Sequence, residues 1–178
     1  MTSNNKIIII GRTATAAFPA EDIKDIPVKI DTGADGSSIW ASDLNIDANG
    51  TLHFVLFGIG SPYYSGKRHN TKQYTAHLIR SSNGQAQIRY KVTLSIVLAG
   101  KKIRGSFSLA DRSQNSYPVL VGCRLLNKKF IVDVSKHSKI KPPLIPDPSG
   151  ILVKELKKNP RAFFEKYHID NHRGDIDL

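Results

Sequence analysis

The stretch VKIDTGADGSSI, from Val28 to Ile39, joins a short apolar strand pattern to an abrupt turn. The strand pattern ends in Asp31, and the turn that follows is formed by Thr32, Gly33, Ala34 and Asp35. Such a segment presents one carboxylate at the end of a strand, and its glycine allows another backbone to approach closely. The alternative is a structural Asx turn, in which Asp31 bonds only to its own backbone. We favour a chemical role for Asp31 because of the preceding strand and a second motif farther along the chain.

Short apolar runs, separated by Gly, Asn, Pro or Ser, dominate residues 6–135. Several alternate with period two, which is typical of β-strands. The predicted strands are 7–10, 26–30, 52–57, 74–79, 88–98, 103–109, 119–121 and 130–134. Hairpin turns are predicted at SSNG (81–84) and AGKK (99–102), and an irregular loop is predicted over 58–72. This pattern predicts an all-β domain, either a closed barrel or a sandwich.

The composition changes after Ser138, so we predict a first domain over residues 1–138. Residues 139–150 contain a Pro-rich linker. Residues 151–178 are predicted to form a helical C-terminal extension with helices at 151–158 and 161–168. Asn159 and Pro160 supply the N-cap and the first position of the second helix.

Charge and cysteine usage limit the classes of partner. The 178 residues include 26 Lys and Arg against 15 Asp and Glu, a formal net charge of +11, which attracts polyanions or simply forms a solvated basic surface. The lone Cys123 excludes an intrachain disulfide and is typical of a cytoplasmic protein. The isoleucines at 7–10 are too few for a signal sequence, and no apolar run is as long as a membrane span. We therefore expect a soluble, cytoplasmic protein that does not contact a membrane.

A second motif, YPVLVGCRLL at 117–126, is an apolar strand that ends in glycine and leads into a short helix. Together with the Asp-Thr-Gly segment it resembles the retropepsin-like aspartic proteases. The resemblance is closer to a bacterial retropepsin-like family often labelled "ATP-dependent zinc protease" and covers about residues 6–135. It rests on the order of KIIIIGR (6–12), VKIDTGA (28–34), RSSNGQ (80–85), LADR (109–112) and YPVLVG (117–122).

The resemblance implies a closed β-barrel with one short helix, and an active site assembled from two chains. Each chain would contribute Asp31, and two neighbouring carboxylates that share a proton would activate water. Thr32 would lock the two active-site loops together, and Gly33 would offer its backbone to the substrate. A flap over the cleft is implied within residues 77–90, with its tip at Ser81, Ser82, Asn83 and Gly84. The alternatives are that this segment is a plain exposed turn, or that a second hairpin within 51–75 lies near the cleft.

The second motif departs from the family at one position. Retropepsins place an arginine directly after the glycine, where it pairs with the residue matching Asp35. Here Val121 and Gly122 are followed by Cys123, and Arg124 comes one place later. Either Arg124 or Arg112 replaces the missing partner, or the ion pair that supports the dimer is absent. Cys123 itself is interpreted as a packed small side chain.

No metal or cofactor is expected. The chain lacks His-Glu-x-x-His and Cys-x-x-Cys spacings, so the word "zinc" in the family label finds no motif here. His168 and His172 follow Glu165 near the end of the chain, where a fraying helix explains them better than a metal site. The stretch GSPYYSGKR (60–68) has the wrong spacing for a phosphate loop and places Arg where Ser or Thr is needed.

The sequence therefore predicts a homodimeric aspartic endopeptidase with Asp31 as its catalytic residue. Family members are associated with ligases that add glutamates to proteins, which together with the basic charge suggests acidic or polyglutamate-tailed substrates. The alternative is a non-catalytic module that uses the same barrel to bind an acidic protein or nucleic acid. Nucleic-acid binding alone would show a steep dependence on salt and no dependence on Asp31.

Overall fold

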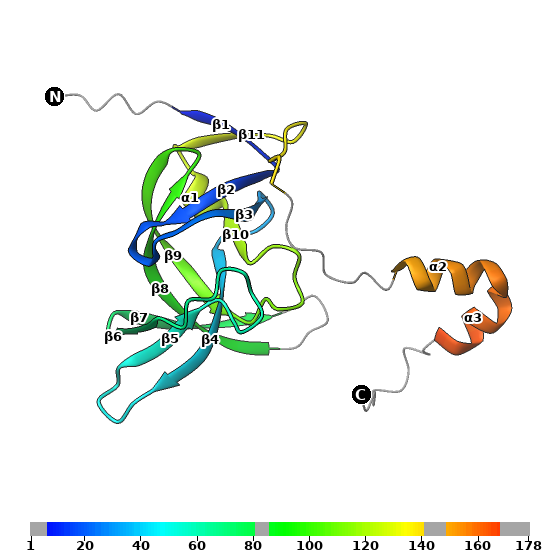
Figure 1. Cartoon of the computed structure of the whole chain (residues 1–178), viewed down its shortest axis with the longest axis horizontal. Helices are drawn as coiled ribbons and strands as arrows, with labels where there is room; N and C mark the ends of the chain where they lie inside the picture. The colour runs from blue at the N-terminus through cyan, green and yellow to red at the C-terminus, as the bar shows by residue number, and fades with distance from the viewer. Residues whose placement is uncertain (1–6, 81–85, 141–148, 168–178) are drawn as a thin grey trace. The chain divides into compact units, whose positions relative to one another are not determined.

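The computed structural model describes residues 7–80, 86–140 and 149–167 (Figure 1). The chain divides into two compact units, residues 1–143 and residues 144–178. The predicted flap tip, Ser81 to Gly84, lies outside the described residues, as do His168 and His172. No helix in the described part of the chain is both long enough and apolar enough to cross a bilayer.

The first unit is built around a closed ring of six strands. Within it β3 (Ile23–Asp31) lies between β10 (Val119–Gly122) and β2 (Thr13–Phe18). The next strand of the ring, β8 (Ala86–Leu98), pairs with β2. The ring goes on through β9 (Lys101–Ala110) to β4 (Ser37–Ile46), which pairs again with β10. This closure confirms the closed all-β barrel expected from the sequence.

Further strands extend the barrel. β5 (Leu52–Leu56) adds to β4, β6 (Arg68–Thr71) adds to β5, and β7 (Tyr74–Arg80) pairs with β8 (Figure 1). A separate parallel pair joins β1 (Ile8–Gly11) to β11 (Phe130–Asp133), near the two ends of the unit. The short α1 (Cys123–Leu126) follows β10 directly, as the second motif predicted. A 3₁₀ turn, η1 (Pro19–Glu21), links β2 to β3.

The core fills the inside of the ring with side chains from alternating strand positions. In β3, Val28 and Ile30 are buried whereas Lys29 between them is exposed, which is the two-residue period of a strand covered on one face. The fully buried residues include Ile26, Ile39, Leu52, Phe57, Ile96, Leu98, Phe107 and Val119. Burial of this apolar surface is the main source of stability for a barrel without disulfides.

Three strands were missed by the sequence analysis, and the predicted loop over 58–72 is wrong at 68–71. β2 reads TATAAF and β6 reads RHNT, so neither has the bulky apolar alternation that marks a strand. β4 begins with two serines, Ser37 and Ser38, that are nevertheless buried. Main-chain pairing with neighbouring strands places these segments, and such pairing leaves no pattern in the local sequence.

The turn predicted near Gly100 is confirmed. β8 and β9 pair antiparallel up to Leu98 opposite Lys101, so the loop contains only Ala99 and Gly100. Both residues have positive φ, 47° and 77°, as a type I′ turn requires. The long β8–β9 hairpin that results forms one wall of the barrel.

The second unit contains the two predicted helices, α2 (Ser149–Lys158) and α3 (Pro160–Tyr167). Asn159 caps α3, because its Oδ1 accepts a hydrogen bond from Ala162 N at 3.0 Å. Glu155 of α2 accepts hydrogen bonds from Lys166 Nζ at 2.7 Å and from Tyr167 Oη at 3.0 Å. Polar contacts therefore join the two helices to each other.

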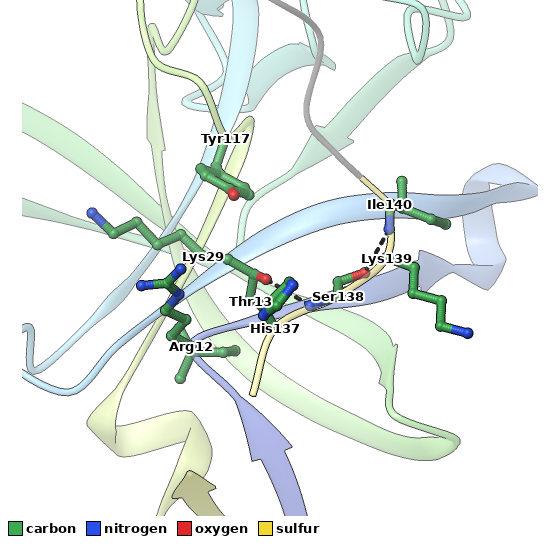
Figure 2. Close-up of a pocket in the computed structure, with 9 residues that line it drawn as sticks. Arg12, Thr13, Lys29, Tyr117, His137, Ser138, Lys139 and Ile140 are labelled. Atoms are coloured by element: carbon green, nitrogen blue, oxygen red, sulfur yellow. Dashed lines mark hydrogen bonds between the residues drawn. The ribbon is translucent and has the colours of Figure 1, made fainter. Parts of the chain in front are cut away.

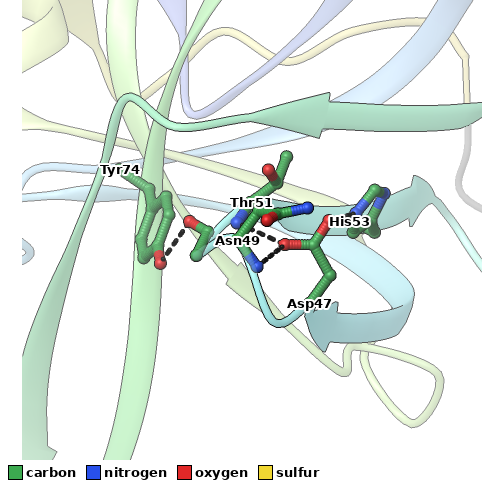
Figure 3. A network of polar contacts seen from close by, with 6 residues as sticks. Asp47, Asn49, Thr51, His53 and Tyr74 are labelled. Carbon is green, nitrogen blue, oxygen red and sulfur yellow. Dashed lines mark hydrogen bonds and ion pairs between the residues drawn. The ribbon is translucent and has the colours of Figure 1, made fainter.

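Asp47 organises the turn between β4 and β5 (Figure 3). Its Oδ1 accepts hydrogen bonds from Asn49 N and Thr51 N, both at 2.9 Å, and its Oδ2 lies 2.9 Å from His53 Nε2. The hydrogen bond with His53, followed by that from Thr51, lowers the pKa of Asp47 from 3.8 to about 2. Tyr74 Oη donates to Gly50 O at 3.1 Å and so attaches this turn to β7.

Asp47→Asn is expected to lower the melting temperature slightly at neutral pH, because a neutral amide oxygen is a weaker hydrogen-bond acceptor than a carboxylate for the N–H donors of the turn. The depressed pKa means that Asp47 stabilises the fold fully above its ordinary pKa of 3.8 and loses this effect as the pH falls through about 2. The difference between wild type and variant should therefore be present at about pH 5 and shrink below about pH 4. Thermal unfolding followed by circular dichroism measures it, and a difference that persists unchanged to the lowest pH would contradict this role.

Candidate active site

Asp31 lies at the carboxyl end of β3, directly opposite Gly122 at the end of β10. β10 runs parallel to β3 and antiparallel to β4, so it lies between the two strands that flank residues 32–36. The two motifs, separated by most of the domain in sequence, are therefore adjacent in space. Parallel pairing explains why their strand ends meet at the same edge.

The turn after Asp31 is supported by the carboxylate itself. Asp31 Oδ1 accepts a hydrogen bond from Gly33 N at 3.0 Å, which is the Asx-type bond considered as the structural alternative. Oδ2 has no hydrogen-bond partner within the described ranges, and the residue is half-exposed. Asp31 thus supports its own turn and still offers a carboxylate oxygen for chemistry.

The second motif holds the loop that follows Asp31, residues 32–36, through hydrogen bonds. Cys123 N donates to Ala34 O at 2.8 Å, and Arg124 N donates to Asp35 O at 3.0 Å. The Cys123 thiol donates to Thr32 O at 3.0 Å, and the residue is half-buried. These bonds fix the backbone of the loop relative to the start of α1.

Gly122 is required where the two motifs touch. Its N–H donates to Ser37 Oγ at 3.1 Å in a buried contact. A Cβ at this position would lie 2.6 Å from Ala34 O and even closer to Gly36 O, so no larger residue fits without moving the loop. The close approach of β10 to the loop therefore depends on this glycine.

Arg124 forms the ion pair with Asp35 that was expected of an arginine at position 123. Its Nη2 lies 3.6 Å from Asp35 Oδ2, and the two side chains are 75% and 87% exposed. Such an exposed pair contributes little to stability, roughly 0–1 kcal/mol.

Arg112 has a different position from the one considered for it in the sequence analysis. Its Nε donates to Tyr117 O at 3.0 Å, and its Nη1 donates to Ser38 Oγ at 3.0 Å. Burial lowers the pKa of Arg112, the charge of Arg89 lowers it further, and the charge of Asp31 opposes both. Arg112 is thus a hydrogen-bonded cation whose charge acts on Asp31, a position that the LADR motif did not by itself indicate.

The candidate flap has well-paired arms. β7 and β8 pair from Tyr74 opposite Val92 to Arg80 opposite Ala86. On one face, Tyr74 packs edge-to-face on Tyr90 with 5.8 Å between ring centroids, and these rings contact the core. Farther along the same face, Leu78 and Ile88 oppose each other and are 58% and 65% exposed. The arms therefore carry an uncovered apolar face.

Residues 51–75, the alternative considered for a hairpin near the cleft, also contain a hairpin. It is formed by β5 and β6 and extends from β4.

Among the described residues, one chain brings one candidate carboxylate, that of Asp31, to the end of β3. In the part of the chain that the structure describes, no second carboxylate bonds to Asp31, and no group of three or more metal-ligating side chains gathers. An open cavity of about 560 Å³ adjoins the loop, and its lining residues are Thr32, Cys123, Arg124, Leu126, Asn127, Lys128, Phe130 and Val132. The geometry alone supports water activation only if another carboxylate arrives from outside the chain.

Comparison with known proteins identifies relatives of the barrel. The sequence model of the family described as "Retropepsin-like aspartic endopeptidase RimB" matches residues 9–143. Two proteins named "Probable alpha-L-glutamate ligase", from Shewanella pealeana and Shewanella halifaxensis, are each 31% identical over 137 residues. The match covers 75% of this chain but only 30% of theirs. A Legionella pneumophila protein of unknown function, solved as a crystal structure, has the same fold, with a TM-score of 0.57 and 21% identity over 75% of this chain and 98% of that one.

Proposed function

Because the chain belongs to the RimB-like family of retropepsin-like aspartic endopeptidases, we propose that it hydrolyses peptide bonds with two Asp31 carboxylates, one from each subunit of a homodimer. The observation that carries this proposal is the interlocking of the two motifs around Asp31. β10 places Gly122 opposite Asp31, and main-chain bonds hold the loop that follows Asp31. Among the described residues, Asp31 Oδ2 has no hydrogen-bond partner. The site is incomplete in one chain and complete in a symmetric pair.

The proposed chemistry follows from two carboxylates at close range. They do not ionise together easily, so one is protonated and the other ionised, which is the general pattern of aspartic proteases. The ionised Asp31 takes a proton from a water molecule that attacks the peptide carbonyl carbon. The protonated Asp31 of the other subunit donates to the carbonyl oxygen, which gives a tetrahedral diol that is not bonded to the protein. The carboxyl that took the water proton then gives it to the amide nitrogen, the C–N bond breaks, and the amine and carboxylic acid products leave.

The dimer contact is proposed to lie around Thr32. The open cavity beside Thr32, Cys123 and Arg124 adjoins the catalytic loop, so a second loop docking there would bring its own Asp31 close. The β7–β8 hairpin is proposed as the flap, because its exposed Leu78 and Ile88 provide an apolar face that a bound peptide would cover.

Acidic or glutamate-tailed peptides are the proposed substrates. The net charge of +11 favours an acidic partner, and the two relatives are named as glutamate ligases. The single cysteine also fits our proposal that the protein acts in the cytoplasm.

The direct test is incubation of the full chain with peptides that carry glutamate-rich or neutral tails, with products identified by mass spectrometry. We expect cleavage of the glutamate-rich peptides to be faster and to slow as salt screens the basic surface. Equal cleavage of both sets at every ionic strength would remove the acidic-substrate proposal. No cleavage at mildly acidic or neutral pH would favour the binding-module alternative.

A subunit-mixing experiment tests the shared site. If each active site needs Asp31 from both subunits, a ninefold excess of the Asp31→Asn variant, equilibrated with wild type, should reduce the wild-type activity to about one tenth, because random pairing leaves few wild-type homodimers. The control adds the same excess of an unrelated basic protein. Activity that is unaffected by the variant would show that one chain suffices and would contradict the dimeric site.

A further inference from the structure

A basic cavity of about 400 Å³ opens on the outer side of β2 and β3 (Figure 2). It is bounded by β2 and β3, by Tyr117 before β10 and by the segment that follows β11. The lining residues are Arg12, Thr13, Lys29, Ile30, Tyr117, His137, Ser138, Lys139 and Ile140. All of them belong to the first unit.

The charges around this cavity are of one sign. Arg12, Lys29 and Lys139 are cationic, His137 adds an imidazole, and none of the nine lining residues is acidic. Among the described residues, none of these four side chains forms an ion pair. The cavity therefore has an uncompensated positive potential, which favours an anionic ligand.

The walls of the cavity are fixed by hydrogen bonds. Arg12 N donates to Lys136 O at 2.9 Å, and Ile30 N donates to Arg12 O at 3.0 Å. Ser138 N donates to Thr13 Oγ1 at 2.8 Å, so the segment after β11 lies along the start of β2 (Figure 2). Gly11 permits this close approach, since a Cβ there would lie 2.8 Å from His137 N. The cationic groups thus project from an ordered backbone.

The cavity lies near Asp31. Lys29 and Asp31 alternate along β3 with buried Ile30 between them, so both lie on the outer face, about 7 Å apart along the strand. Tyr117 lies in the same region, because its carbonyl oxygen accepts a hydrogen bond from Arg112. The charge of Arg112 in turn interacts with that of Asp31. An extended peptide advances about 3.3 Å per residue, so a residue one or two places from a bond at Asp31 reaches the cavity.

We propose that this cavity is the subsite that binds side-chain carboxylates of the substrate, with Lys29 and Arg12 setting the preference for acidic residues beside the cleaved bond. This inference rests on the proposed peptidase function. Ile30, Ile140 and the Tyr117 ring supply apolar surface next to the cations. A glutamate side chain matches that combination, because its methylene groups pack on apolar surface and its carboxylate reaches the basic groups.

Binding to an inactive protein tests the subsite separately from catalysis. In the full-length Asp31→Asn background, triglutamate affinity is measured by isothermal titration calorimetry, with trialanine and inorganic phosphate as the other probes. We expect Lys29→Met and Arg12→Gln each to weaken triglutamate binding by about 10-fold, the loss of one charge-assisted contact. Lys102→Met is the matched control, since it removes one exposed lysine at the β8–β9 turn, outside the cavity, and should change affinity by less than about twofold.

Several results would overturn the subsite. The first is an affinity for triglutamate that is the same in all these variants. The second is tight, Lys29-dependent binding of phosphate by a protein that binds triglutamate no better than trialanine. A melting temperature close to wild type for each variant excludes misfolding as the cause of a loss, because Lys29 and Arg12 are exposed.

Charge reversal provides a second readout in the active protein. Lys29→Glu is expected to lower kcat/KM for peptides with Glu near the cleaved bond and to raise it for matched peptides with Lys, so that the ratio of the two falls at least about 10-fold. If wild type cleaves and this ratio does not move, the subsite is wrong while the proposed peptidase stands. If wild type cleaves nothing yet triglutamate binding depends on Lys29, the peptidase proposal fails while the anion subsite stands.

Discussion

Asp31→Asn is expected to reduce peptidase activity by at least about 10³-fold, because both proton transfers of the proposed mechanism pass through this carboxylate. Asparagine keeps the shape of the side chain and an oxygen that can accept the 3.0 Å hydrogen bond from Gly33 N. The turn should therefore persist, and the melting temperature should change by no more than about 2 °C. Initial rates on a glutamate-rich peptide and thermal unfolding measure the two effects.

The matched control for Asp31 is Asp35→Asn in the same turn. The Asp35 side chain makes an exposed 3.6 Å pair with Arg124, so its loss should leave most of the activity in place at saturating dimer concentration. If the two variants lose activity equally, the loop as a whole rather than the Asp31 carboxylate is responsible. If Asp31→Asn retains wild-type activity, the aspartic mechanism is wrong.

Gly122→Ala is expected to cause the largest loss of stability of any single methyl addition near the site. The new Cβ would meet two main-chain carbonyls, Ala34 O at 2.6 Å and Gly36 O at a shorter distance, and main-chain atoms do not rotate away as a side chain does. Overpacking of this kind costs about 3 kcal/mol, which lowers the melting temperature by about 6–12 °C in a domain of this size. Because the displaced loop carries Asp31, activity should fall as well.

Gly36→Ala provides the control, because Gly36 lies in the loop that Gly122 contacts. A Cβ at Gly36 meets nothing within 4 Å, so the same chemical change should alter the free energy of unfolding by less than about 1 kcal/mol. Chemical denaturation of both variants measures the difference. A Gly122→Ala protein as stable as Gly36→Ala would mean that β10 does not approach the loop as closely as described.

Much of the barrel could be predicted because its strongest signals are local. The alternation of residues 88–98 marks β8, and the Gly100 turn sets its pairing with β9. Asp31 and Gly122 each end a short apolar run, and the resemblance of the two motifs to a known family indicated that they belong to one site. Asn159 and Pro160 marked the start of α3 in the same way, through the chemistry of helix capping.

Other features depend on which strands become neighbours, and no local pattern encodes that. The polar β6 is a strand because it pairs with β5, and the buried Ser37 hydroxyl accepts a hydrogen bond from Gly122 N. Residues 12, 29 and 139 are ordinary basic positions along the chain. They surround one cavity because β2 pairs with β3 and the segment after β11 returns along β2.

The amino-acid sequence thus determined most of the strands, the Gly100 turn and the candidate reactive carboxylate, since each follows from side-chain period, turn chemistry or a motif of a few residues. The closure of the barrel through β10, the position of Arg112 near Asp31 and the basic cavity beside Lys29 were decided by long-range packing. These arrangements bring together residues from distant parts of the chain, and their energy comes from contacts that exist only once the chain has folded.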